Sequence, residues 1–165
     1  MRRRTSSWRL AHASSRIRAE VKKRTSCGVI VTDGHRILLG HATRSPRWDI
    51  PKGIAEPGET FAIAATRELF EETGLVVPET ELRDLGVHGY LRDKDLALFA
   101  WTPRTLPAPE TLECRSTFTL RNGTVVPEFD RFGLFVLSEA LGKVGKNLAR
   151  VLAGLRAGEA IVTNT

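Results

Sequence analysis

Apolar runs separated by polar turns dominate the hydrophobic pattern of the chain. Residues 27–32 form a mostly apolar run that predicts a buried strand, and Asp33-Gly34 is typical of a hairpin turn. Residues 36–40 would then be the returning strand. Further strands are expected at residues 83–91, 96–102, 115–120 and 131–137, with another turn at Asn122-Gly123.

Two segments have the sequence pattern of helices. Thr60 can cap a helix that runs to about Thr73, with Gly74 as its C-terminal stop. Ser138 is expected to cap a second, amphipathic helix that continues to about Leu155. Strands interrupted by one central and one terminal helix predict an α/β or α+β fold.

The length and composition are those of one globular domain. The chain has 165 residues, of which 41% are hydrophobic and 27% charged. No apolar run approaches the ~20 residues of a membrane-spanning helix, so no membrane association is expected. The two cysteines are far apart in sequence and form no zinc or disulfide pattern, which favours a reducing, cytoplasmic location.

Positive charge is concentrated at the N-terminus. Residues 1–24 hold nine of the 25 basic side chains and one of the 19 acidic ones, so residues 25–165 are slightly acidic. We therefore expect a basic, flexible arm over residues 1–24 and a folded domain over residues 25–165. A mobile tail is the simplest interpretation of the arm, and binding to RNA or organellar targeting are the alternatives.

Acidic residues gather on one side of the predicted central helix. At 100° per residue, Glu68, Glu71 and Glu72 fall within an arc of about 100°. Beside this arc runs an apolar stripe formed by Ala62, Ala65 and Leu69. Like charges at this spacing repel each other, although Arg67 can offset part of the repulsion by pairing with Glu71 or Glu59. A hard divalent cation, Mg²⁺ or Mn²⁺, would make the arrangement favourable, because its ligands would all be oxygens.

Residues 53–75, GIAEPGETFAIAATRELFEETGL, resemble the Nudix box. That box has the pattern G, five residues, E, seven residues, R-E-U-x-E-E-x-G-U, where U is aliphatic. The sequence matches the pattern at Gly53, Glu59, Arg67, Glu68, Leu69, Glu71, Glu72, Gly74 and Leu75. The resemblance implies an α/β/α sandwich with a mixed β-sheet over about residues 25–157. It also implies a Mg²⁺-dependent hydrolase that cleaves a pyrophosphate bond.

The same resemblance implies roles for the matched residues. The metal ligands would be the carboxylates of Glu68, Glu71 and Glu72 and the carbonyl of Gly53. Glu59 and Arg67 would brace the loop against the helix and orient Glu68. The general base would be either Glu68 or an acid outside the box. Of the outside acids, Glu128 is the best candidate, and weaker ones are Asp93, Asp95 and Asp130.

Basic and aromatic residues precede the box. Lys52 is a candidate for binding substrate phosphate, and its Pro-Lys-Gly context resembles the diadenosine polyphosphate and diphosphoinositol polyphosphate branches of the family. Arg44 and Arg47 could assist Lys52, although solvated surface positions are the simpler interpretation. Trp48 is expected to anchor the loop rather than to stack on a base.

These inferences favour an enzyme whose partner is a small nucleotide. Dinucleoside polyphosphates or nucleoside triphosphates rank first as substrates, ADP-sugars second and RNA 5′ ends third. One alternative is a non-catalytic Nudix-like nucleotide sensor, which would be expected to lack box carboxylates. Another is an RNA-associated protein whose fold is incidental. The sequence leaves a homodimer open.

Overall fold

The structure is a computed structural model that describes residues 23–157. Apart from Lys23 and Arg24, the predicted basic arm lies outside the described residues. In chain order the elements are β1 (Arg24–Val31), β2 (Arg36–Ala42), β3 (Trp48–Asp49), β4 (Lys52–Ile54), α1 (Phe61–Thr73), η1 (Glu79–Glu81), β5 (Arg83–Leu91), β6 (Lys94–Trp101), η2 (Pro109–Thr111), β7 (Thr117–Thr119), β8 (Val125–Pro127), β9 (Phe129–Val136), α2 (Leu137–Lys143) and α3 (Lys146–Ala157).

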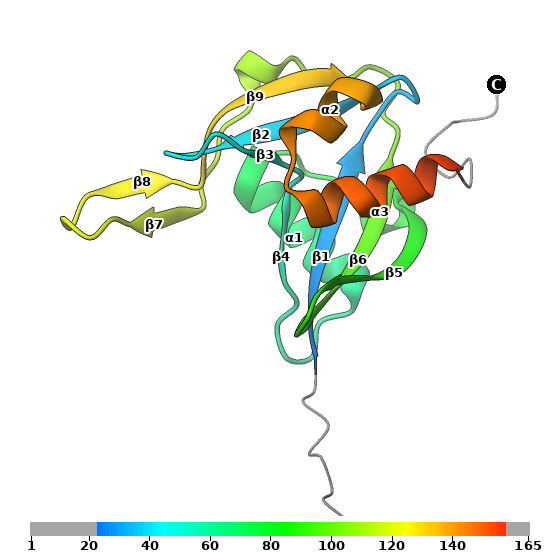
Figure 1. The fold of residues 1–165 in the computed structure, drawn as a ribbon, viewed down its shortest axis with the longest axis horizontal. Helices are drawn as coiled ribbons and strands as arrows, with labels where there is room; N and C mark the ends of the chain where they lie inside the picture. Colours follow the sequence, from blue (N-terminus) through cyan, green and yellow to red (C-terminus); the bar gives the residue numbers. More distant parts are fainter. Residues whose placement is uncertain (1–22, 158–165) are drawn as a thin grey trace, which may run out of the picture.

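The strands form a mixed sheet and two antiparallel units. The mixed sheet has the order β4-β1-β6-β5, in which β1 runs parallel to β6 and antiparallel to β4. A second sheet has the order β3-β2-β9, and β7 pairs with β8 in a separate hairpin that projects from the body of the molecule (Figure 1). The predicted α/β class and its mixed sheet are confirmed.

The expected hairpin between residues 27–32 and 36–40 is wrong in its pairing. The turn forms, because the Asp33 carboxylate accepts hydrogen bonds from the backbone N–H groups of His35 and Arg36. Beyond the turn, however, β1 and β2 enter different sheets, and the bridge between Thr32 and Ile37 is the contact they share. Both edges of β1 are already occupied by β4 and β6, so β2 has no free edge to pair with.

Alternating side chains of β1 supply two hydrophobic clusters. Val29 and Val31 pack in the cluster that contains Leu69 of α1, whereas Ile30 packs in the cluster that contains Leu148 and Leu152 of α3. Helix α1 lies behind the mixed sheet and α3 in front of it (Figure 1). The sheet is therefore covered on both faces, as expected of an α/β/α sandwich.

The terminal helix differs from its prediction because it is broken. Helix α2 starts after Val136, and no side-chain hydrogen bond caps it, so Ser138 is not the predicted cap. The helix ends at Lys143, and the next residue, Val144, has an extended backbone (φ −83°, ψ 166°) that forms a parallel bridge with Trp48. Helix α3 then begins after Gly145. The hydrophobic pattern of the sequence predicts one continuous helix, but this contact with β3 divides it into α2 and α3.

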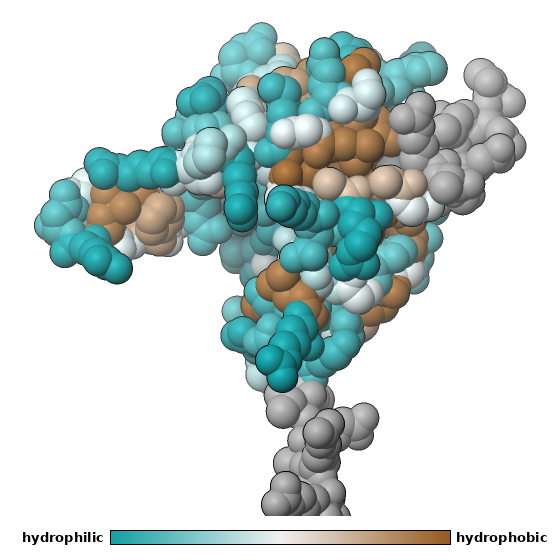
Figure 2. All heavy atoms as spheres, viewed as in Figure 1, coloured by the Kyte–Doolittle hydropathy of each residue, from teal (hydrophilic) through white to brown (hydrophobic). Residues whose placement is uncertain are grey.

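Most of the visible surface is hydrophilic, with local apolar patches (Figure 2). One patch lies on the projecting β7–β8 hairpin, where the exposed hydrophobic residues include Phe118 and Val125. Within residues 23–157, no helix combines the length and the apolar character needed to cross a membrane.

Candidate active site

Helix α1 begins and ends where its sequence predicts. The Thr60 hydroxyl accepts a hydrogen bond from the Ile63 N–H at 3.2 Å, and Gly74 adopts the left-handed conformation (φ 79°). The Gly74 N–H donates to the Phe70 carbonyl at 2.8 Å. Both ends of the helix are therefore fixed by local contacts, and the rotation of its acidic face is set by the apolar stripe.

The three predicted metal-binding carboxylates divide between two environments. Glu68 and Glu72 are 9% and 3% exposed, on the side of α1 that carries buried Leu69. The Glu71 side chain is 42% exposed. Burial raises the pKa of Glu68 above its usual range, because a charged carboxylate loses solvation there. Two of the three carboxylates thus lie in the interior and the third lies at the rim.

Arg67 connects the box carboxylates to one another. Its Nε and Nη2 atoms donate to the two oxygens of Glu59 at 2.8 and 2.9 Å, a bidentate pair. Its Nη1 atom donates to Glu68 at 2.7 Å and to Glu71 at 3.3 Å. Hydrogen bonds from Arg67 are the main reason that the pKa of Glu59 falls to about 2. The predicted pairing of Arg67 with Glu59 and Glu71 is present.

Two backbone contacts tie this network to the loop before the helix. The Nη2 atom of Arg67 donates to the Ile54 carbonyl at 3.1 Å, directly after Gly53 in β4. The Glu59 carboxylate also accepts a hydrogen bond from the Glu56 N–H at 2.8 Å. The pair therefore holds the loop, the helix and the Glu68 carboxylate in one arrangement.

Gly53 lies directly against the Glu68 carboxylate. A Cβ atom at position 53 would stand 2.1 Å from the carboxyl carbon of Glu68, far inside van der Waals contact. Close approach, and not a positive φ angle, distinguishes this glycine: an added Cβ would displace the Glu68 carboxyl group from its position. The backbone of β4 and the side chain of Glu68 consequently share one crowded, oxygen-rich corner.

Glu128, which lies far along the chain, meets Glu72 of the helix. Burial, followed by a hydrogen bond with Glu128, raises the pKa of Glu72 to about 9, so the two carboxyls share a proton near neutral pH. Glu72 also accepts a hydrogen bond from the Lys52 N–H at 2.8 Å. Backbone hydrogen bonds to Thr43 and Ser116, both at 2.9 Å, hold Glu128 in place.

These residues line a hollow of about 290 Å³. Its lining comprises Ala42, Thr43, Asp49, Lys52, Glu72, Phe118, Glu128 and Phe129. The ammonium of Lys52 donates to the Asp49 carboxylate at 2.5 Å. Burial is the largest single influence on the pKa of Lys52 and lowers it, but the charge and hydrogen bond of Asp49, together with the charges of Tyr90 and Glu72, raise the pKa above its usual value, so Lys52 stays protonated. The hollow therefore contains one cation among several carboxylates.

Several predicted candidates lie elsewhere. Arg44 and Arg47 are exposed and do not line the hollow. The alternative bases are engaged in other ion pairs: Asp93 with Arg24, Asp95 with Lys23, and Asp130 with Arg131. Trp48 packs edge-to-face on Phe135 and His41, which supports its expected role as an anchor. Among the outside acids, the structure brings Glu128 to the box carboxylates.

Five of the eight lining residues were not predicted from the sequence, and two of these, Asp49 and Phe118, bear on the chemistry. Asp49 lies three residues before Lys52, a spacing that could have signalled their ion pair. Phe118 lies in a three-residue strand and is followed by a polar turn, so its sequence context gave no signal. Asp49 in β3 and Phe118 in β7 are brought to the same hollow by the tertiary structure, which local sequence patterns do not predict.

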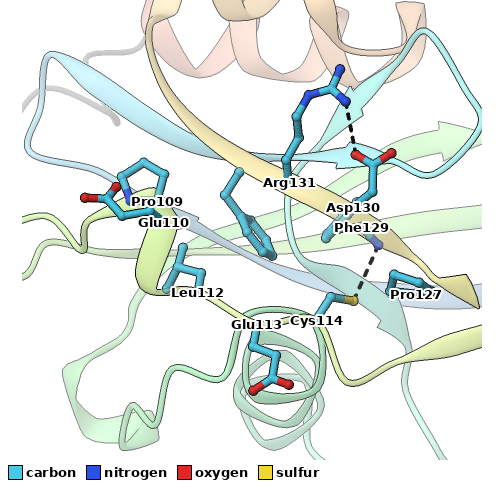
Figure 3. A pocket seen from close by; sticks show the side chains of 10 residues that line it. Pro109, Glu110, Leu112, Glu113, Cys114, Pro127, Phe129, Asp130 and Arg131 are labelled. Carbon is cyan, nitrogen blue, oxygen red and sulfur yellow. Dashed lines mark hydrogen bonds and ion pairs between the residues drawn. The ribbon is translucent and has the colours of Figure 1, made fainter.

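A larger hollow, of about 560 Å³, lies beside the first (Figure 3). Its lining is formed by Pro109, Glu110, Leu112, Glu113, Cys114, Pro127, Phe129, Asp130, Arg131 and Phe132. Phe129 lines both hollows, but none of the box residues lines the larger one. Three acidic residues and one basic residue line each hollow, so charge does not distinguish the two. The smaller hollow is the better candidate site because Glu72 of the box lines it.

Within residues 23–157, no three Asp, Glu, His or Cys side chains lie close enough together to coordinate a metal ion. Arg67 accounts for this arrangement, since it occupies oxygens of both Glu68 and Glu71. The donor set nevertheless consists only of oxygens, and Glu68 fills the space that a Cβ on Gly53 would need. Burial first, and Glu128 second, raise the pKa of Glu72, and a hard divalent cation bound there would favour its charged form.

The chain is similar to known proteins over much of its length. A NUDIX domain family model matches residues 22–119, more than half of the chain. An uncharacterized 17.7 kDa protein of Enterobacteria phage T4 is 36% identical and covers 82% of this chain and 98% of its own. An RNA pyrophosphohydrolase of Dinoroseobacter shibae is 40% identical over 39% of this chain and 42% of its own.

The fold is also similar to that of solved structures. An Ap4A hydrolase structure from C. elegans superposes with a TM-score of 0.59 at 21% identity, covering 82% of this chain and 98% of that one. At this identity the superposition shows the fold alone. Together with the matched domain and the complete box, it agrees with the assignment that the sequence relatives establish. The chain belongs to the NUDIX family of pyrophosphohydrolases.

Proposed function

We propose that this protein hydrolyses a pyrophosphate bond in a nucleoside diphosphate linked to another group, with Mg²⁺ as its metal and Mn²⁺ as a substitute. One observation carries the proposal. Buried Glu72 lies against Glu128 in a hollow that also contains protonated Lys52. Such an arrangement is costly in the absence of a cation and a phosphate, and becomes favourable when both are bound.

Oxygen atoms around Gly53 would hold the metal. The proposed ligands are the carboxylates of Glu68, Glu71 and Glu72 and the carbonyl of Gly53. When bound, the cation would neutralise charge on the diphosphate oxygens. Arg67 and Glu59 are proposed as positioning residues, because their hydrogen bonds direct Glu68 toward the backbone of β4.

Glu128 is the proposed general base. It lines the hollow, whereas Glu68 does not, and one oxygen of Glu68 is already engaged by Arg67 at 2.7 Å. A carboxylate in this position can take a proton from water as the oxygen attacks phosphorus. Glu68 is the alternative base, and comparison of the two glutamine variants separates them.

Lys52 is proposed to bind a substrate phosphate. Its ammonium is protonated and lies in the hollow, where Asp49 holds it at 2.5 Å. A phosphate oxygen would replace or share this contact, so Asp49 sets the direction of the ammonium. Arg44 and Arg47, exposed and outside the hollow, are candidates only for phosphates that project into solvent.

Dinucleoside polyphosphates or nucleoside triphosphates are the first substrates to test, followed by ADP-sugars. RNA 5′ ends form a second candidate class, which the partial likeness to an RNA pyrophosphohydrolase supports. The purified protein would be incubated with Mg²⁺ and each compound, and the products identified. ATP plus AMP from diadenosine tetraphosphate would select the dinucleotide class. Failure to cleave any member with either metal would support the alternative of a nucleotide sensor.

A further inference from the structure

Two aromatic side chains line the hollow that contains Glu72, and of the two Phe118 is exposed whereas Phe129 is buried. Phe118 of β7 is 38% exposed, whereas Glu72 in the same hollow is 3% exposed. The hollow is therefore charged in its interior and aromatic toward solvent. Exposure alone would not single out Phe118, since other large apolar side chains are as exposed, but Phe118 also lines the hollow that contains Glu72 and Lys52.

The pairing of the hairpin fixes the direction of this ring. Phe118 pairs with Val126, and Thr119 pairs with Val125. Since successive side chains of a strand alternate between faces, Phe118 and Val126 share one face and Val125 lies on the other. Val125 is 62% exposed, while Val126 is half-buried. The face that carries Phe118 is accordingly the one turned toward the body of the protein.

Backbone hydrogen bonds hold the hairpin at a set position relative to the carboxylates. The N–H groups of Arg115 and Ser116 donate to the Glu71 carbonyl at 2.7 and 3.0 Å. On the other strand, the Glu128 N–H donates to the Ser116 carbonyl at 2.9 Å. The base of the hairpin is thus joined to the end of α1 and to Glu128, which positions Phe118 next to the site of chemistry.

We propose that Phe118 forms a nucleobase subsite at the mouth of this hollow. The inference rests on the proposed function, because the substrate's diphosphate would occupy the charged interior. A planar base attached to that diphosphate would then extend toward solvent, where the ring of Phe118 offers a surface for stacking. Stacking does not depend on a pattern of hydrogen-bond donors. Phe118 should therefore increase the affinity for ligands that carry a nucleobase, without distinguishing one base from another.

Equilibrium binding tests the subsite without requiring turnover. ADP and inorganic diphosphate would each be titrated into the full-length protein with Mg²⁺ by calorimetry. Phe118→Ala is expected to weaken ADP binding about 5- to 100-fold, the loss of one base–aromatic stack, and to leave diphosphate binding within about twofold. Phe118→Trp should retain ADP affinity. Val125→Ala, on the opposite face of the same hairpin, is the matched control and should change neither affinity.

Three results would overturn the subsite. Equal weakening of ADP and diphosphate by Phe118→Ala would show a general structural effect, and unchanged ADP affinity would show that the ring does not contact the base. A change in oligomeric state with unchanged ADP affinity would assign Phe118 to contact between two copies of the chain. Absence of hydrolysis by the wild-type protein would contradict the proposed function alone, since the ADP comparison would still report on Phe118.

Discussion

Glu72 of helix α1 and Glu128, just before β9, lie within hydrogen-bonding distance of each other although one belongs to the box and the other does not. Two buried carboxyls at this separation share a proton when no cation is present. Their proximity joins the helix to the strand that follows the projecting hairpin, and it determines how the site should respond to pH, metal and substitution.

Metal binding should release a proton. The pKa of Glu72 is raised to about 9 by burial and by Glu128, whereas an unfolded glutamate titrates near 4.5. Metal-free protein should therefore lose stability as pH rises from about 4.5 to 9, and added Mg²⁺ should restore it. Thermal unfolding with EDTA or Mg²⁺ between pH 6 and 9 checks the change in stability. Mg²⁺ affinity, measured by titration, should rise by at most about tenfold per pH unit. Calorimetry at pH 7 that detects no proton release would contradict it.

Glu128→Gln should lower kcat by about 10²- to 10⁴-fold, the range expected when a general base is removed. Glutamine keeps the size of the side chain, so folding should be preserved. Glu68→Gln is the informative comparison, because it removes a proposed metal ligand that also binds Arg67. A loss of Mg²⁺ affinity with Glu68→Gln, but not with Glu128→Gln, would support the division of roles. Full activity of Glu128→Gln would assign the base to Glu68.

Gly53→Ala should abolish most of the hydrolytic activity, whereas Gly89→Ala should not. The added Cβ would meet the Glu68 carboxyl carbon at 2.1 Å, so the carboxylate must leave its position. Gly89→Ala is the control, because a Cβ there meets nothing within 4 Å and Gly89 has no positive φ. Crystal structures or kinetics of both variants would check the result. Similar activity in the two proteins would show that the position of Glu68 is not critical.

The Glu59–Arg67 pair should stabilise the protein in a pH-dependent way. The pKa of Glu59 is lowered to about 2, mainly by hydrogen bonds from Arg67, so the stabilisation is complete above about pH 4.5 and is lost as pH falls toward 2. Glu59→Gln should therefore lower Tm at pH 7 and have a smaller effect at pH 3. Glu56→Gln, in the same loop, serves as the control. An equal decrease in Tm at both pH values would argue against the ion pair.

Local features of the fold could be predicted, and competition between distant segments could not. Thr60 and Gly74 set the ends of α1 through contacts within a few residues, so their positions followed from the sequence. The pairing of β1 depends instead on β4 and β6, distant segments that occupy its two edges. The break in the terminal helix likewise depends on a bridge from Val144 to Trp48, which no local pattern contains.

The site shows the same division. Spacing alone placed Glu68 and Glu72 near each other on the helix, and the contact of Arg67 with Glu71 follows from the same spacing. The role of Arg67 in orienting Glu68 was expected from the family resemblance. The approach of Glu128 depends on backbone hydrogen bonds to Thr43 and Ser116, which belong to separate loops. It was proposed from a family resemblance rather than from residue spacing. No sequence pattern indicated that Phe118 lines the site, because a single aromatic residue in a short strand is common in proteins.

The most direct test of carboxylate-dependent pyrophosphate cleavage compares wild-type protein with Glu72→Gln. Diadenosine tetraphosphate and nucleoside triphosphates would be incubated with each protein in Mg²⁺, and the phosphorus-containing products would be followed by ³¹P NMR. Wild-type protein should cleave at a bridging oxygen, and Glu72→Gln should be slower by at least about 10²-fold while its metal-free Tm at pH 8 is unchanged or higher. Equal rates in the two proteins would contradict a role for the buried carboxylate in the reaction.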